Sequence, residues 1–193
     1  LQHKPLIGML HLSTGLSILG LLWWVVLREQ RFWKPVNAAP AVLDDLRPRA
    51  FIGLLLVITQ IILGGWTSAN YAGLACPDFP TCRGVWWPPM DFVEGFARWR
   101  DIGLDYEGGM LSLAAATAVH MAHRIGAVIT FVYITWLALH TMRLGYENNL
   151  CRYGFLVLVL VVAQVFLGAT TVLFHLPIVL DVMHTGVAAL MLL

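Results

Sequence analysis

Four long apolar stretches restrict the fold of this chain more than any other feature of its sequence. They cover about residues 5–27, 50–66, 117–142 and 153–174, and a further stretch begins near Pro177. A helix needs roughly 20 mostly apolar residues to cross a bilayer, where its backbone polar groups must be satisfied internally. Hydrophobic residues make up 59% of the chain and charged residues only 12%, which excludes an ordinary soluble domain. The sequence therefore predicts an all-α integral membrane protein, an antiparallel bundle of transmembrane helices.

The charges of the connecting segments predict how the helices cross the membrane. Basic residues gather in the connections 28–49 and 143–152, and the positive-inside rule assigns both to the cytoplasm. The connection 67–116 and the short turn at 175–176 are poorer in basic residues and are expected to face outward. The connection 67–116 is longer than ordinary loops, which predicts a functional cap or lid. The net charge of +1 gives no indication of a nucleic-acid partner.

A short internal repeat links two parts of the chain. The runs TQIILGGWT (59–67) and AQVFLGATT (163–171) share the pattern Gln-x-x-Leu-Gly-x-x-Thr. Each run lies on a helix expected to cross outward, and the next helix carries a histidine near its start, His123 or His184. The first apolar stretch, with His11, has the character of the second helix of another such pair. Tandem helix pairs are common in membrane proteins, although so short a run can also recur by chance.

His11, His123 and His184 are expected at similar depths in the outer leaflet, roughly 9–11 Å below its edge at 1.5 Å per helical residue. Ionisable groups inside a membrane are costly and indicate function by default. A haem held between two helices takes one neutral imidazole from each. The equivalent places of His123 and His184 in the repeat therefore predict a bis-His haem, and a hydrogen bond between packed helices is the alternative. His120 is the rival ligand on nearly the same helix face.

The other polar candidates have different expected roles. Arg124 either extends to the membrane interface or pairs with a haem propionate. His3 lies near the start of the chain, His140 at the cytoplasmic end of a helix and His175 in an external turn, so none of these three is expected to bind a metal.

The segment ACPDFPTC (75–82) places two cysteines in the outward connection. Structural zinc sites take four ligands from more closely paired cysteines, and here there is no second pair. An oxidising compartment favours a disulfide between Cys76 and Cys82 over free thiols or a metal site. Cys151 is expected to be a free thiol at the membrane edge.

The segments LGGWTSANYAGLACPDFPTCRG (63–84), HMAHRIGA (120–127), QVFLGATTVLFHLP (164–177) and VMHTGVAAL (182–190) together resemble the haem A synthase family. The resemblance covers essentially the whole chain, and the GLACPDFPxC phrase is its most specific part. It implies eight helices in two four-helix pseudo-repeats, of which about five are expected here. Residues 1–27 would be the last helix of the N-terminal, substrate-haem half, 28–49 a cytoplasmic linker, and 50–193 the C-terminal, haem-b-binding half. That half would contain the external loop 67–116 and a truncated last helix.

The resemblance also implies roles for particular residues. His123 and His184 would be the axial ligands of a b-type haem, with Arg124 as a propionate partner. His11 would bind the iron of the substrate, haem O. The external cysteine pair would form a disulfide over the haem. The catalytic residues are unassigned, because the carboxylate linked to catalysis is expected upstream of Leu1, which would leave this fragment incomplete as an enzyme.

The activity implied by the resemblance is oxidation of a methyl substituent of haem O to a formyl group. The product, haem A, serves terminal oxidases, and the b-type haem serves electron transfer. Expected partners are the lipid bilayer, haem O, haem O synthase and an electron donor that the sequence does not identify; a homo-oligomer is compatible with it. The expected location is a bacterial plasma membrane, with the mitochondrial inner membrane as the alternative. The competing functions are a b-type cytochrome that passes electrons from a quinol to a partner, and a transporter or haem-handling protein without redox chemistry.

Overall fold

The computed structural model describes residues 4–29, 38–97, 111–145 and 150–193. These residues form α-helices and one short 3-10 helix, and the described part of the chain contains no β-strand. Four of the helices are long and apolar enough to cross a membrane, which confirms an all-α integral membrane fold. In chain order the elements are α1 (Lys4–Glu29), α2 (Pro40–Ala69), η1 (Ala72–Leu74), α3 (Phe92–Gly95), α4 (Leu113–Leu144), α5 (Leu150–Leu173) and α6 (Ile178–Leu192).

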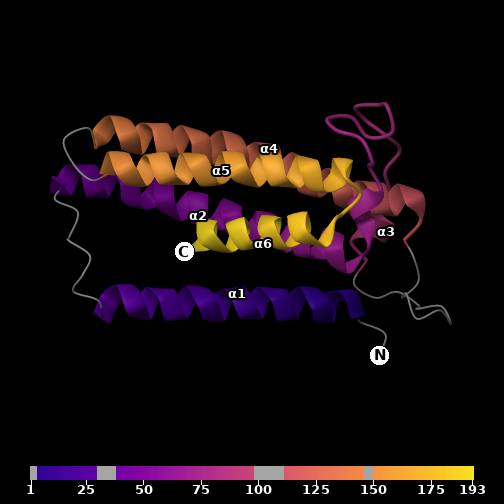
Figure 1. Cartoon of the computed structure of the whole chain (residues 1–193), viewed down its shortest axis with the longest axis horizontal. Helices are drawn as coiled ribbons and strands as arrows, with labels where there is room; N and C mark the ends of the chain where they lie inside the picture. Colours follow the sequence, from indigo (N-terminus) through magenta and orange to yellow (C-terminus); the bar gives the residue numbers. More distant parts are fainter. Residues whose placement is uncertain (1–3, 30–37, 98–110, 146–149) are drawn as a thin grey trace.

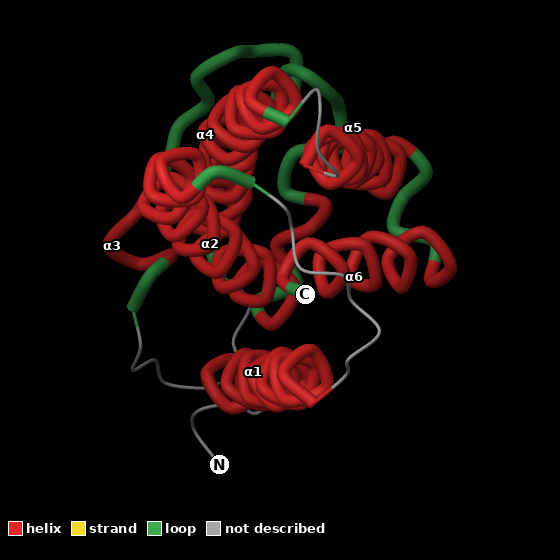
Figure 2. Tube along the Cα trace, turned by 90° about the vertical axis from the view of Figure 1, so that its left-hand side faces the viewer, coloured by secondary structure: helices red, strands yellow, loops and turns green. Residues whose placement is uncertain are grey.

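Among the described residues, the helices α2, α4, α5 and α6 form a ring, and α1 lies outside it. Around the ring, α2 packs against α4, α4 against α5 and α5 against α6, and a smaller contact between α6 and α2 closes it. Figure 2 shows this ring nearly end-on, with α1 separate below it. In Figure 1 the same helices run side by side, and α1 lies along the α2 side of the bundle. As a result, α4 and α6 occupy opposite corners of the ring.

Local signals at the helix ends explain where the structure departs from the expected spans. The α2 helix starts at Pro40, well before residue 50, because proline suits the first helical turn. The α4 helix starts at Leu113 because the Ser112 side chain caps it by accepting a hydrogen bond from the Ala115 N–H. Residues 40–49 of the expected linker are therefore helical, and residues 30–37 lie outside the described residues.

Large apolar side chains cover the outside of the bundle, as a lipid environment requires. Leu21 is 61% exposed, Val128 63% and Phe166 66%. Between the helices, small residues allow close packing. A Cβ on Gly154 of α5 would lie only 2.7 Å from the Ala138 carbonyl oxygen of α4. The bundle thus holds its helices together at small residues and presents its large ones outward.

The described part of the connection between α2 and α4 folds over one end of the ring. The Trp66 indole N–H donates to the Gly95 carbonyl oxygen at 3.0 Å, and the Asp91 N–H donates to the Ala114 carbonyl oxygen at 3.1 Å. The α5–α6 turn lies at the same end, where the side chain of Leu176 reaches Gly73. Figure 1 shows this cap at the end of the bundle where α4 begins and α5 ends.

Candidate functional site: two imidazoles at opposite corners

The first histidine of the candidate site, His123, is held by α2. The side-chain amide nitrogen of Gln60 lies 2.9 Å from His123 Nδ1 and also donates to the His123 carbonyl oxygen at 3.0 Å. One turn further along α2, a Cβ on Gly64 would be 3.0 Å from His123 Cε1. Glycine at position 64 therefore gives the imidazole room to lie against bare backbone.

The second histidine, His184, is also held by a glutamine and a glycine, those of α5, but this glutamine meets the other ring nitrogen. The amide nitrogen of Gln164 lies 3.3 Å from His184 Nε2, and a Cβ on Gly168 would be 3.0 Å from His184 Cε1. The internal repeat therefore corresponds to a repeated contact, in which a glutamine and a glycine one turn apart hold a histidine of the following helix. This recurrence is more than a chance similarity of sequence would produce.

The two imidazoles belong to helices at opposite corners of the ring, with α2 and α5 as the side walls. The earlier start of α4 makes residue counting from the helix ends a poor measure of depth. The matching contacts with Gly64 and Gly168 instead place His123 and His184 at equivalent levels of their helix pairs.

The donor set of this site suits a haem better than a bare metal ion. Among the described residues no cluster of three or more His, Cys, Asp or Glu side chains could hold a metal. A porphyrin supplies four nitrogen ligands itself, so its iron needs only two from the protein. His184 Nδ1 is buried and has no hydrogen-bond partner among the described residues, which leaves an unused ligand atom at the site. The residues present therefore fit an iron porphyrin.

The rival ligand His120 has a different environment. It is only 3% exposed, and both of its ring nitrogens face N–H donors. The Cys76 backbone N–H lies 3.4 Å from Nδ1, and the Arg124 Nε–H lies 3.2 Å from Nε2. His120 thus serves to attach the cysteine loop to α4, which favours His123 as the ligand.

Arg124 continues this attachment. Its guanidinium donates to the carbonyl oxygens of Thr81 at 2.7 Å, Cys76 at 2.8 Å and Asp78 at 2.7 Å, and it lies over the Phe79 ring. Most of its N–H groups are therefore used by the loop. The predicted contact of Arg124 with a haem propionate stays a prediction.

The cysteine loop is a compact, cross-linked turn. Cys76 and Cys82 form a disulfide, as predicted, and both are essentially fully buried. Asp78 closes the loop by accepting hydrogen bonds from the Thr81 hydroxyl and from the backbone N–H groups of Gly84 and Arg83. These bonds, the Thr81 hydroxyl foremost, hold the pKa of the Asp78 carboxyl well below its ordinary range.

The remaining histidines lie away from this pair. His11 is exposed on α1, outside the ring. His140 Nε2 lies 2.8 Å from an Asp45 carboxylate oxygen, and its ring stacks on Trp136. His175 lies in the α5–α6 turn with a positive φ of 61°. His3 lies outside the described residues. The role of His11 as a ligand of the substrate iron stays a prediction.

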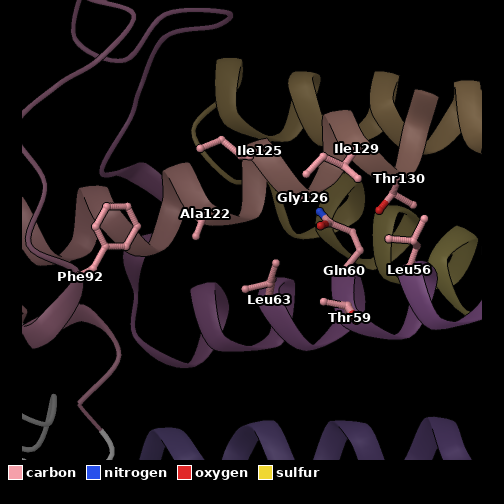
Figure 3. Close-up of a pocket in the computed structure, with 10 residues that line it drawn as sticks. All are labelled: Leu56, Thr59, Gln60, Leu63, Phe92, Ala122, Ile125, Gly126, Ile129 and Thr130. Atoms are coloured by element: carbon pink, nitrogen blue, oxygen red, sulfur yellow. The ribbon is translucent and has the colours of Figure 1, made fainter. Parts of the chain in front are cut away.

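An apolar pocket of about 380 Å³ lies between α2 and α4 and shares Gln60 with the site. Figure 3 shows its lining, with Gln60 reaching from α2 toward Gly126 on α4. A Cβ at Gly126 would lie 2.4 Å from the side-chain oxygen of Gln60, so glycine is needed beside the amide. The lining residues are Leu56, Thr59, Gln60, Leu63, Phe92, Ala122, Ile125, Gly126, Ile129 and Thr130.

Sequence reasoning did not give Gln60, Gln164, Gly64 or Gly168 a function, although all four belong to the repeat that it identified. The signal was present in the order of residues, because the same Gln-x-x-Leu-Gly run precedes each of the two paired histidines. The partner of each glutamine became visible only with the packing of the helices.

Known proteins resemble this chain over most or all of its length. The chain is 38% identical over 193 residues to a haem A synthase of Shewanella oneidensis, covering all of this chain and 57% of that protein. It is 31% identical over 184 residues to a haem A synthase of Methylobacterium radiotolerans, covering 95% of this chain and 46% of that protein. This chain therefore spans about half the length of these curated relatives. No solved structure matches it significantly. The cytochrome oxidase assembly protein family matches residues 1–193, the whole chain, and the chain belongs to that family.

Proposed function

We propose that this chain is the haem-b-binding part of a haem A synthase, the oxidoreductase that oxidises a methyl substituent of haem O to the formyl group of haem A. The observation that carries the proposal is the repeated glutamine–glycine–histidine contact, which places one imidazole on α4 and one on α6 across the ring. The family and the names of the relatives support the same function.

In this proposal His123 and His184 hold the iron of a b-type haem, which supplies one-electron transfer when bound. Residues 50–193 form the haem-binding half, and α1 belongs to the half that binds haem O, with His11 on the substrate iron. The two side walls, α2 and α5, orient the imidazoles and close the site from lipid. The cap between α2 and α4 covers the end of the site nearest the cysteine loop.

The membrane location follows from the same reasoning. The chain is a multi-pass membrane protein whose relatives named above are bacterial. We place it in the plasma membrane with the cysteine loop outside, because Arg28, Arg143 and Arg152 lie at the opposite end of the bundle from that loop. A cysteine introduced in the cap in place of Val93, which is 87% exposed, is expected to react with a membrane-impermeant reagent in intact cells, and no reaction would contradict this orientation.

The test of the ligands uses the full-length protein and its visible spectrum. Wild-type protein is expected to purify with a low-spin b-type spectrum, and His123→Leu or His184→Leu is expected to abolish that signal. His175→Asn is the matched control, because it removes an exposed turn histidine and asparagine tolerates a positive φ. A b-type signal that persists in both leucine variants contradicts the ligand assignment.

A b-type cytochrome that carries electrons from quinol to a partner would share the two imidazoles. Pigment analysis of a deletion strain separates the two functions. Accumulated haem O with no haem A supports the synthase, whereas normal haem A supports the cytochrome. His11→Leu provides a second test, because only the synthase needs an iron ligand on α1.

A further inference from the structure

Each glutamine of the repeat contacts one ring nitrogen of a candidate ligand, Gln60 at His123 Nδ1 and Gln164 at His184 Nε2, and each also has an unused atom. Gln60 Oε1 and Gln164 Oε1 are both buried without a hydrogen-bond partner among the described residues. We propose that Gln60 and Gln164 are positioning residues, whose amides fix the orientation and the proton of each axial imidazole so that its other ring nitrogen is free for iron. This inference rests on the proposed function.

Each imidazole is oriented by a glutamine and a glycine on one face of a neighbouring helix. Residues four apart on a helix lie on one face, so each glutamine and the glycine four residues after it contact the same imidazole. The bare backbone of Gly64 limits where the His123 ring can lie, and the Gln60 amide limits how that ring can rotate. Gly168 and Gln164 impose the same two limits on His184. Two contacts of different kinds therefore fix each ring before any ligand binds.

The same amides also fix the proton of each imidazole. A neutral imidazole that binds iron through one nitrogen carries its N–H on the other, and this N–H is normally matched by an acceptor. A glutamine amide can donate through its nitrogen or accept through its oxygen. A half-turn of the amide brings the unused Oε1 to the ring N–H. For Gln60 this turn exchanges two contacts of the amide nitrogen, with His123 Nδ1 and with the His123 carbonyl oxygen, for one bond from the imidazole N–H.

The unpaired amide oxygen occurs at both places of the repeat. One buried, unpaired amide oxygen beside a histidine could be an accident of packing. Two of them, on α2 and on α5, each beside an imidazole and each at the same place in the repeat, indicate a shared requirement. That requirement is a hydrogen-bond acceptor for the imidazole N–H, and the amide oxygen supplies it at both places.

The chemistry of the amide predicts a direction for the reduction potential. A hydrogen-bond acceptor on the ring N–H makes the imidazole a stronger donor to iron and favours the ferric state. Gln60→Leu and Gln164→Leu remove the acceptor, so each is expected to raise the midpoint potential. Gln60→Glu supplies a stronger acceptor of the same shape and is expected to lower it.

The experiment uses the full-length, haem-containing protein in detergent. Spectroelectrochemical titration gives the midpoint potential, and competition with apomyoglobin gives haem retention. Loss of such a partner typically weakens binding 10–100-fold, and the two leucine variants are expected to fall in that range. The controls are Thr59→Val and Thr170→Val, because these hydroxyls donate only to carbonyls of their own helices. Both controls are expected to match the wild type.

The outcomes separate this inference from the proposed function. A wild-type protein without a bis-His spectrum overturns both. A normal wild-type spectrum with unchanged potential and retention in the leucine and glutamate variants overturns the positioning role alone, as does an equal change in the threonine controls. Gln60→Glu keeps the shape of the side chain, so it decides the question if a leucine variant fails to fold.

Discussion

Arg124 is predicted to keep the Cys76–Cys82 disulfide shielded from reductants. The guanidinium holds three carbonyl oxygens of the loop, those of Cys76, Asp78 and Thr81, and it also contacts His120. The disulfide sulfurs belong to residues that are 0% and 1% exposed, so a reductant can reach them only when the loop opens. The rate of reduction therefore reports how often the loop leaves the end of α4.

The size of the effect follows from the number of bonds. At a net contribution of about 1 kcal/mol for each of the three carbonyl bonds, Arg124→Leu destabilises the closed loop by about 3 kcal/mol. Because 1.4 kcal/mol is a factor of ten, the open population and the reduction rate are expected to rise by roughly 100-fold. Arg124→Lys keeps the charge but loses the planar fork, and a rise of about tenfold is expected for it.

The assay is the rate of disulfide reduction by a water-soluble phosphine, followed by thiol alkylation and mass. A Cys151→Ser background removes the free cysteine. The control is Arg83→Leu, because the Arg83 side chain makes one bond to the loop, to the Ala75 carbonyl oxygen at 2.9 Å. That variant is expected to change the rate by roughly fivefold, the equivalent of about 1 kcal/mol. We call the bonds from Arg124 to the three loop carbonyls the loop clamp. Equal reduction rates in wild type and Arg124→Leu would refute this clamp. Equal effects of the two arginine variants would refute a special role for Arg124 in holding the loop.

Two further predictions concern the loop and the bundle. Asp78 has a lowered pKa in the folded loop, so its stabilisation is complete above the unfolded pKa of about 3.9 and is lost as the pH falls toward the folded pKa. Reduction of the disulfide, normalised to a small disulfide, should therefore accelerate below about pH 4 in wild type, and Asp78→Asn should be fast at all pH values and lack this dependence. Gly154→Ala would place a Cβ 2.7 Å from the Ala138 carbonyl oxygen, and a loss of about 1–3 kcal/mol is expected in detergent unfolding. Gly15→Ala, with nothing within 4 Å, should leave the unfolding midpoint unchanged or raise it.

Hydropathy and charge were sufficient to predict the spans because the bilayer imposes one length and one solvent on every crossing helix. The exact helix starts were harder. The α4 helix begins at Leu113 because Ser112 caps it, and the Ser112 hydroxyl and N–H also bond the Glu94 carboxylate of the cap. The start of α4 therefore depends on a contact between residues eighteen apart in the sequence. A hydropathy pattern holds no information about such a contact.

The candidate ligands were predictable for a different reason. A histidine inside a membrane is costly, and two histidines at matching places of a repeat indicate a function without any information on packing. Their partners were not predictable, because the face that α2 turns toward α4 depends on the rotation and offset of both helices. The shared pattern Gln-x-x-Leu-Gly-x-x-Thr does not indicate that its glutamine, rather than its threonine, reaches the imidazole.

The three polar residues of HMAHR illustrate how a helix separates roles that the sequence places together. His120 and Arg124 are four apart, so they lie on one face of α4, where both meet the cysteine loop. His123 lies on the other side of His120 from Arg124, about 100° around the helix from Arg124, and it meets Gln60 and the bare backbone of Gly64 instead. The loop clamp and the candidate iron ligand therefore share one helical turn without sharing a partner. Because the loop and the candidate ligand have different side-chain partners, variants of Arg124 should alter disulfide reduction far more than the spectrum of the haem. A loss of that spectrum in Arg124→Lys, with the protein otherwise folded, would show instead that the guanidinium contacts the haem itself.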